Sequence, residues 1–72
     1  MTADKMFEEL GYWLVNENEN NLIIMNQDYE EIQFNKKSKT FSKSYHYSDA
    51  YITMQELKAI NKKCEELGWL GE

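Results

Sequence analysis

The feature that most constrains the fold of this chain is a phrase that occurs twice, once near each end. It appears as Glu8-Glu9-Leu10-Gly11-Tyr12-Trp13 and again as Glu65-Glu66-Leu67-Gly68-Trp69-Leu70. In each copy a leucine precedes a glycine that can take the left-handed conformation just beyond a helix, and large apolar residues follow. We therefore expect two helices, each ending at one copy of the phrase, that enclose a central segment.

The length of 72 residues allows a single domain, residues 1–72, with one small core. Hydrophobic residues make up 42% of the chain and aromatic residues 14%, which is too much apolar content for a disordered chain. No apolar run approaches the roughly 20 residues that cross a bilayer, and the acidic amino terminus does not resemble a signal peptide. We expect a soluble, cytoplasmic protein.

The first helix is expected at about Ala3 to Leu10, with Thr2 as its N-cap. The second helix follows Thr53, because Thr53-Met54-Gln55-Glu56 has the form of a capping box. Its apolar stripe consists of Met54, Leu57, Ile60, Cys64 and Leu67. Trp69 and Leu70 are predicted to fold against the core beyond the second glycine.

Four strands fit the β-rich segments between the helices: Tyr12–Asn16, Leu22–Met25, Tyr29–Asn35 and Thr40–Tyr47. The joining segments have hairpin lengths, so an antiparallel meander of three to four strands is the simplest arrangement. Lys43 falls on the aromatic side of the last strand and must lie near an edge. The predicted fold is a two-layer α+β domain, in the order helix, four strands, helix, with both helices on one face of the sheet.

Enzymatic activity is not expected from this sequence. His46 is the only obvious general base, and it falls on the solvent-facing phase of a strand. Cys64 lies on the apolar stripe, where a thiol behaves as a small hydrophobe. The chain has no Gly-rich phosphate loop, and its acidic segment 16–21 lacks the glycine and bidentate glutamate of a calcium loop. Neither a cofactor nor a metal is expected.

The net charge of −5 is unevenly distributed along the chain. Residues 1–34 carry eight acids and one lysine, residues 35–47 four lysines and no acid, and residues 48–72 five acids and three lysines. An acidic surface on a compact domain suits binding to a basic protein surface, although the same charge can serve solubility alone. The candidate partner-binding residues are Glu17, Glu19, Asp28, Glu30 and Glu31.

The segment 35–47 suggests an alternative function, because four lysines interleave there with Phe41, Tyr45 and Tyr47. Such a mixture can bind single-stranded nucleic acid, with lysines at phosphates and aromatic rings stacked on bases. The candidate residues for this function are Lys36, Lys37, Lys39, Lys43 and Tyr45. A competing interpretation places the aromatic residues in the core and the lysines in a hairpin turn and an edge strand.

The chain resembles a group of small phage and prophage proteins of Gram-positive bacteria. The resemblance lies in Phe7-x-x-Leu10-Gly11-Tyr12, Ile32-x-Phe34, Ile52-Thr53-x-x-Glu56-Leu57-x-x-Ile60 and Glu66-Leu67-Gly68-Trp69, and it spans nearly the whole chain. It implies a host-cytoplasm setting, in which phage proteins of this size commonly modulate one host or phage protein. It transfers no site residues.

These observations together predict a non-enzymatic accessory protein that acts by protein–protein interaction. The alternatives are a weak binder of single-stranded nucleic acid and a small homodimer formed through an exposed edge strand.

Overall fold

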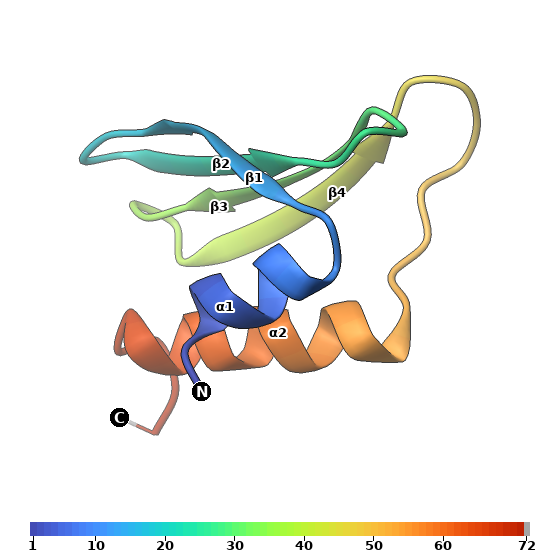
Figure 1. Ribbon diagram of the computed structural model, residues 1–72. Coiled ribbons are helices and arrows are strands. Elements are labelled where there is room, and N and C mark those ends of the chain that lie inside the picture. The colour runs from blue at the N-terminus through green and yellow to red at the C-terminus, as the bar shows by residue number, and fades with distance from the viewer. Residues whose placement is uncertain (72) are drawn as a thin grey trace.

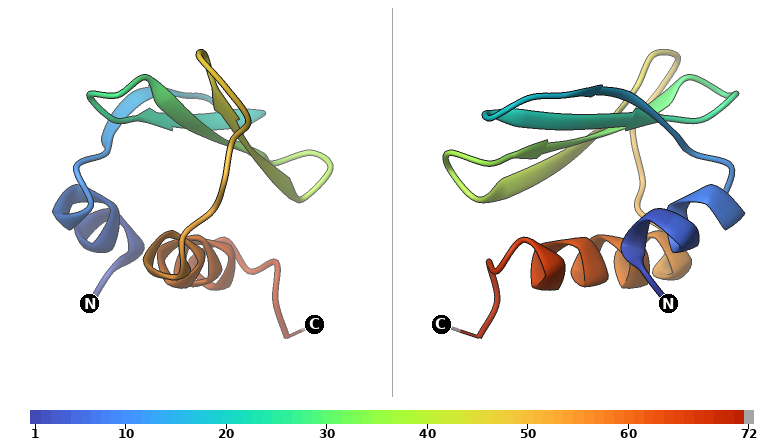
Figure 2. Two further views of the ribbon diagram at one scale, coloured as in Figure 1. Left: turned by 90° about the vertical axis from the view of Figure 1, so that its right-hand side faces the viewer. Right: turned by 60° about the vertical axis from the view of Figure 1, so that its left-hand side comes forward.

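The structure, a computed structural model, describes residues 1–71. These residues form two helices, α1 (Ala3–Glu9) and α2 (Met54–Glu66), and four strands, β1 (Trp13–Glu17), β2 (Asn21–Met25), β3 (Glu30–Asn35) and β4 (Thr40–Tyr45). The strands make one antiparallel sheet in the order β1-β2-β3-β4. Both helices cover the same face of the sheet, and the other face is open (Figures 1 and 2). The predicted two-layer α+β meander is therefore confirmed.

The first copy of the repeated phrase ends α1 as the sequence predicts. Gly11 has a φ of 89°. Its N–H donates to the carbonyl of Glu8, and the N–H of Tyr12 donates to the carbonyl of Phe7, each at 3.0 Å. This pair of hydrogen bonds is the Schellman motif, and the rings of Phe7 and Tyr12 meet edge to face at 5.9 Å. The cap therefore directs the chain from the helix into the core.

The second copy ends α2 in the same way. Gly68 has a φ of 78°, and its N–H donates to the carbonyl of Glu65 at 3.0 Å. The N–H of Trp69 donates to the carbonyl of Cys64 at 2.9 Å. Trp69 is half-buried against the core, as predicted, but Leu70 is exposed and the prediction for it is wrong.

The three hairpin turns are each organised by one asparagine, namely Asn18, Asn26 and Asn35. In every case the side-chain oxygen accepts hydrogen bonds from two backbone N–H groups that follow it, at 2.8 to 3.1 Å. Such local bonds satisfy turn N–H groups that no strand can reach. They explain why asparagine marks the points where the sheet reverses.

Two turn residues adopt a conformation that side chains rarely take. Tyr29 has a φ of 64° and Lys39 a φ of 59°. The left-handed region costs a residue other than glycine roughly 1 to 2 kcal/mol, and a bulky side chain is an outlier there. Lys39 lies in the β3–β4 turn, whereas Tyr29 ends the β2–β3 turn with an aromatic ring that is 60% exposed.

The sheet turns the apolar residues of its two central strands toward the helices. Leu22 and Ile24 of β2 lie beside Phe34 and Ile32 of β3, and all four are buried. Ile32 and Phe34 are 0% exposed, because they are covered by the helices and flanked by strands on both sides. Within β3, Ile32 and Phe34 alternate with the half-buried Glu31 and Gln33.

The core is completed by aromatic and aliphatic residues from outside the central strands. Phe7 of α1 and Trp69 each lie against Phe34, with ring centroids at 6.2 Å and 6.3 Å. From α2, Ala59 and Ile60 are buried in the same cluster. A ring at the centre of the sheet thus contacts both terminal segments, which ties them into one core.

The buried face of α2 differs from the predicted stripe. Met54 and Leu57 are 65% and 42% exposed, so their placement in the core is wrong. Their place is taken by Glu56 and Lys63, whose side chains are only 8% and 10% exposed. Both are paired with opposite charges, and such pairing allows a polar side chain to occupy a buried position.

The amino-terminal segment is fastened to α2 by polar contacts. The backbone N–H of Ala3 donates to a carboxylate oxygen of Glu66 at 2.9 Å, and the Lys63 ammonium lies 2.8 Å from the Asp4 carboxylate. The predicted N-cap is confirmed, since the Thr2 hydroxyl accepts from the N–H of Lys5 at 3.2 Å. No helix within residues 1–71 combines the length and the apolar character that crossing a bilayer requires.

Candidate functional site

The edge strand β1 leaves three consecutive apolar side chains in solvent. Trp13, Leu14 and Val15 are 50%, 57% and 48% exposed. The pairing of β1 with β2 is interrupted between Leu14 and Asn16, which places a bulge at Val15. Bulges are typical of sheet edges and re-aim the side chains around them. All five residues of β1 are exposed, so this strand has no buried face.

A groove runs between β1 and α1, on the inner side of the sheet. Its apolar lining comes from Phe7 of α1, Tyr12 at the helix–strand junction, Trp13 and Leu14 of β1, and Leu22 and Ile24 of β2. It encloses about 390 Å³. We call it the α1–β1 groove. It exists because the seven-residue α1 is too short to cover the whole inner side of β1 and β2.

Carboxylates surround the α1–β1 groove. Asp4 and Glu8 reach it from α1 and Glu17 from β1, and Lys63 is the one cationic residue in its lining. Each carboxylate is also paired: Asp4 with Lys63, Glu8 with Lys5 and Glu17 with Lys36, at 2.8 to 3.1 Å. The Glu8–Lys5 pair is exposed and the Glu17–Lys36 pair partly exposed, and pairs of this kind hold their charges weakly, so these two carboxylates can exchange their partners.

A buried polar network lies behind the groove. The Tyr12 hydroxyl donates to Glu56 at 2.8 Å, and the Lys43 ammonium lies 2.8 Å from the other carboxylate oxygen of Glu56. The backbone N–H of Thr53 donates to that oxygen at 3.0 Å, which completes the predicted capping box. Lys43 also donates to the carbonyl of Tyr51. The network therefore joins β4, α2 and the end of α1.

The pKa values in this network follow from its contacts. Burial raises the pKa of Tyr12 far above its ordinary value, and the adjacent Glu56 carboxylate adds to that rise. Burial alone would raise the pKa of Glu56, but hydrogen bonds from Lys43, Thr53 and Tyr12 together lower it. Tyr12 therefore stays protonated and Glu56 stays ionised at neutral pH. The network is a fixed structural element, since neither group is poised to exchange a proton.

The other candidate reactive residues are separated from one another. Cys64 is buried in the core, and this burial raises the pKa of its thiol, which makes it a poor nucleophile. His46 is exposed just beyond β4, with its ring edge-on to Tyr47 at 4.9 Å. Residues 1–71 contain no group of three His, Cys, Asp or Glu side chains arranged to hold a metal ion.

The five predicted acidic candidates do not form one surface. Glu17 and Glu19 lie at the β1–β2 turn, whereas Asp28, Glu30 and Glu31 lie at the β2–β3 turn, at the other end of β2. Glu17, Glu19 and Asp28 are exposed. Glu31 is half-buried, and so is Glu30, whose carboxylate lies 3.6 Å from the Lys43 ammonium. Of the five, only Glu17 borders the α1–β1 groove.

The lysines proposed for nucleic-acid binding are also divided. Lys36, Lys37 and Lys39 lie in the β3–β4 turn, while Tyr45 lies at the far end of β4. Lys36 is held by Glu17 and by the carbonyl of Asn18. The Lys43 side chain is 3% exposed, so the edge position predicted for it is right but its ammonium is not at the surface.

Sequence reasoning missed the α1–β1 groove and its acidic residues on α1. One signal was available in Trp13-Leu14-Val15, because three consecutive apolar residues in a strand cannot all face one core. The other signal was the short length of α1, which indicates that part of the sheet is left uncovered. A seven-residue helix spans only about 10 Å and cannot cover two strands along their whole length.

Comparison of the chain with protein-family models, with curated proteins and with solved structures finds no match. An α+β fold of this kind supports many activities, so the function of the chain depends on its surfaces.

Proposed function

We propose that this chain is a non-enzymatic accessory protein that binds a partner protein through the α1–β1 groove. The partner contributes an extended, basic segment with at least one apolar side chain. The observation that carries the proposal is the exposed apolar run Trp13, Leu14 and Val15 on an edge strand that borders this groove. Exposed apolar side chains on an edge strand promote unspecific aggregation. Their presence on a folded protein is therefore typical of a site that binds another protein.

The backbone of β1 suits an extended segment as the occupant. β1 pairs with β2 on one side, and within residues 1–71 no strand pairs with its other side. A partner strand can add to such an edge through main-chain hydrogen bonds, while side-chain pockets supply the specificity. The inward-facing Leu14 would then be covered, and burying a leucine fully contributes roughly 1.5 to 3 kcal/mol.

The charge around the groove favours a basic segment. Three carboxylates and one ammonium line it, in a chain whose net charge is −5. Opposite charges at the rim of an interface mainly accelerate association and select the partner, and salt screens this effect. A basic partner would thus bind faster at low salt, while Leu14 would slow its dissociation.

The proposed setting is the cytoplasm of a bacterium that carries a phage or prophage. It rests on the resemblance of the cap and core motifs to small phage proteins. An accessory protein in this setting would modulate one host or phage protein by occupying a surface. This setting guides the choice of lysate for the experiment below.

A pull-down from lysate of a Gram-positive bacterium at 50 mM and 300 mM NaCl tests the proposal. Four proteins are compared: the unchanged chain, Leu14→Ser, Glu8→Gln and Asp28→Asn. Asp28 is the matched control, because it is an exposed carboxylate at the opposite end of β2 from Glu17. Light scattering on the same samples reports homodimers formed through an edge strand.

The expected result is a basic protein that is captured at low salt and lost with Leu14→Ser. Glu8→Gln should reduce its capture, and Asp28→Asn should not. Capture that depends on Asp28 but not on Leu14 would place the interface elsewhere. Recovery of nucleic acid alone would favour the lysine-rich turn, and a dimer that disappears with Leu14→Ser would show that β1 pairs with a second copy.

A further inference from the structure

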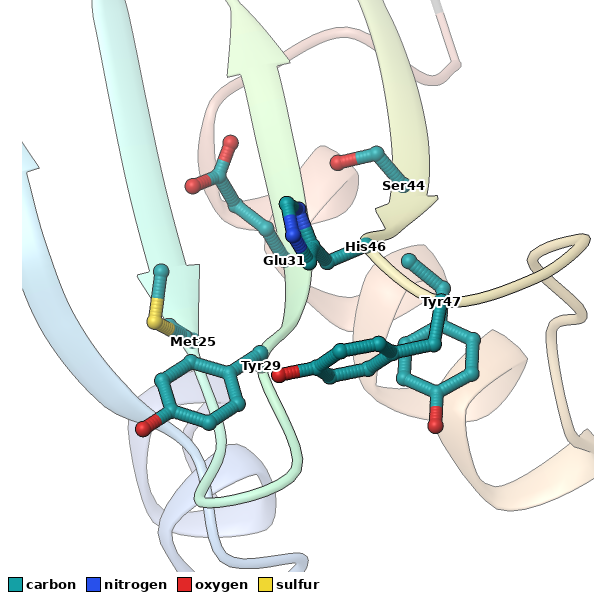
Figure 3. A pocket seen from close by; sticks show the side chains of 7 residues that line it. Met25, Tyr29, Glu31, Ser44, His46 and Tyr47 are labelled. Carbon is teal, nitrogen blue, oxygen red and sulfur yellow. The ribbon is translucent and has the colours of Figure 1, made fainter.

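A second pocket opens on the outer face of the sheet, away from the α1–β1 groove. It lies where the β2–β3 turn meets the segment after β4, and it encloses about 460 Å³. Figure 3 shows Tyr29 and Tyr47 on one side of this pocket and Glu31 on the other, with Met25 and His46 between them. We call it the tyrosine pocket.

The aromatic rings of the tyrosine pocket support one another edge to face. The Tyr47 ring lies 6.3 Å from Tyr29, 5.7 Å from Tyr45 and 4.9 Å from His46, with interplanar angles of 72° to 89°. Because these rings are nearly perpendicular to one another, their electron-rich faces point in different directions around the tyrosine pocket. Such faces attract a cation that approaches within about 6 Å of a ring centroid.

Tyr29 occupies a position that its side chain makes unfavourable. Its φ of 64° suits glycine or asparagine, and its ring is 60% exposed, so burial does not offset the backbone strain. Strained residues of this kind cluster at binding sites. Within residues 1–71, the aromatic ring that the Tyr29 ring contacts is that of Tyr47, inside the tyrosine pocket.

Glu31 supplies the pocket with a negative charge. It lies on the outer face of β3 and is half-buried. Within residues 1–71 its carboxylate has no ion-pair partner, whereas the neighbouring Glu30 lies near Lys43. No lysine lines the pocket. An anion such as a phosphate would therefore meet a carboxylate and no opposing ammonium.

We propose that the tyrosine pocket binds the guanidinium group of an arginine side chain from a partner protein. The planar guanidinium would stack on the exposed tyrosine rings, and its N–H groups would donate to the Glu31 carboxylate. Arginine fits better than lysine because its cation is planar, weakly hydrated and able to stack on a ring while it donates hydrogen bonds. Met25 would contact the aliphatic part of the side chain.

The proposal uses none of the residues of the α1–β1 groove. It rests on the proposed function only in assigning the arginine to a protein, and the experiment below measures the pocket without any partner. Arginine binding at the tyrosine pocket can therefore be disproved while partner binding at the α1–β1 groove is supported, and the reverse.

The experiment is an NMR titration of the ¹⁵N- and ¹³C-labelled chain with N-acetyl-arginine amide. N-acetyl-lysine amide tests the preference for guanidinium. N-acetyl-citrulline amide has nearly the same shape as the arginine probe but carries no charge. We expect saturable shifts of the ring signals of Tyr29, Tyr47 and His46 with the arginine probe, and at least about tenfold weaker binding of the citrulline probe.

Four substitutions assign the binding to the pocket. Tyr47→Ala and Glu31→Gln should each weaken arginine binding by about fivefold. Tyr29→Gly should weaken it to the same degree while the Tm stays the same or rises, because glycine removes the backbone strain. Lys39→Gly is the matched control, since it relieves the other strained φ and should leave arginine binding unchanged.

The proposal is overturned if the citrulline probe binds as tightly as the arginine probe, or if neither probe shifts the tyrosine rings. It is also overturned if Tyr29→Gly lowers the Tm and leaves arginine binding intact, because Tyr29 would then serve the fold. Tighter binding of uridine monophosphate than of the arginine probe would assign the rings to base stacking instead.

Discussion

The two edge strands of the sheet, β1 and β4, differ in the kind of side chain that they turn toward the helices and in how well it is covered. β4 turns Lys43 inward, where Glu56 of α2 neutralises it and the carbonyl of Tyr51 accepts a further hydrogen bond. β1 turns Leu14 inward, but α1 does not cover it and the side chain stays 57% exposed. A charge is thus buried at one edge, and an apolar side chain is left in solvent at the other.

This difference separates the part of the molecule that maintains the fold from the part that is free to bind. A buried ion pair contributes little net stability, but removing one of its partners lowers the free energy of unfolding strongly. We therefore expect the β4 edge to tolerate few substitutions. The side chains of Leu14 and Val15 at the β1 edge are about half exposed and have little burial to lose. Substitutions there should affect binding and leave the fold in place.

The largest effect is expected for Glu56→Ala at the β4 edge. Lys43 would remain buried with only the more distant Glu30 carboxylate, at 3.6 Å, as its counter-charge, and Tyr12 and Thr53 would lose their acceptor. Breaking a buried pair costs about 3 to 5 kcal/mol. Urea unfolding followed by circular dichroism measures the loss.

The double variant Lys43→Met/Glu56→Leu is the control for that change. It removes both charges, and we expect it to regain most of the lost free energy of unfolding. If the double variant is no more stable than Glu56→Ala, the loss comes from packing and not from an unpaired charge.

Trp69→Ala is expected to have the next largest effect. The ring is half-buried against Phe34, so its removal leaves a partial cavity and lowers the free energy of unfolding by about 2 kcal/mol. Leu70→Ala is the matched neighbour, and it should have almost no effect because Leu70 is exposed. Equal effects of the two would mean that the whole segment after Gly68 acts as a unit.

Tyr12→Phe removes one hydrogen bond of the network and keeps the ring in the core. A bond to a charged acceptor contributes about 1.5 kcal/mol, and we expect a loss of that size at pH 7. Thermal unfolding with Phe7→Leu as a packing control separates the lost hydrogen bond from changed ring contacts.

Two groups of the buried polar network, Tyr12 and Glu56, make the stability of the fold depend on pH. The pKa of Tyr12 is raised in the folded state, so its contribution is complete below its ordinary pKa of 10.0 and is lost as the pH rises above it. The pKa of Glu56 is lowered, so its contribution is complete above its ordinary value of 4.5 and is lost as the pH falls through the folded value. In Tyr12→Phe the alkaline loss should shrink, whereas the acid loss should remain in part.

The smallest effect on stability is expected for Leu14→Ser and Val15→Thr at the β1 edge. Both residues are about half exposed, and we expect each change to alter the free energy of unfolding by less than about 0.5 kcal/mol. Urea unfolding measures this value. A loss above 1 kcal/mol would show that the β1 edge supports the fold as the β4 edge does.

The sequence predicts the boundaries of this fold because they depend on local backbone chemistry. Gly11 and Gly68 end the helices, and Thr53 with Glu56 begins α2, through contacts among residues close in the chain. Asparagine side chains set the turns in the same local way. Signals of this range can be recognised without knowledge of the tertiary contacts.

The orientation of α2 could not be predicted in this way. Apolar periodicity favours Met54 and Leu57 for the core, but the true buried face includes Glu56 and Lys63. Their counter-charges, Lys43 and Asp4, are 13 and 59 residues distant in the chain. Such long-range pairs change which face of a helix is buried, and the helix sequence does not reveal them.

The candidate surfaces were only partly predictable for a similar reason. Glu17 borders the α1–β1 groove and Glu31 the tyrosine pocket, and the sequence names both among its acidic candidates. The groove itself depends on how far α1 extends beside β1. The pocket depends on Tyr47 folding back toward Tyr29, across 18 residues of chain. Both are products of tertiary packing.

The attachment of α1 to α2 has a consequence for synthesis on the ribosome. The four strands pair with their immediate neighbours in sequence, so the sheet can form as soon as β4 is available. Ile32 and Phe34 then face solvent until α2 is translated. The reason is that α1 is held in place by contacts of Ala3 and Asp4 with residues near the carboxyl end of α2. The nascent chain is therefore most prone to aggregation between the completion of β4 and the arrival of α2.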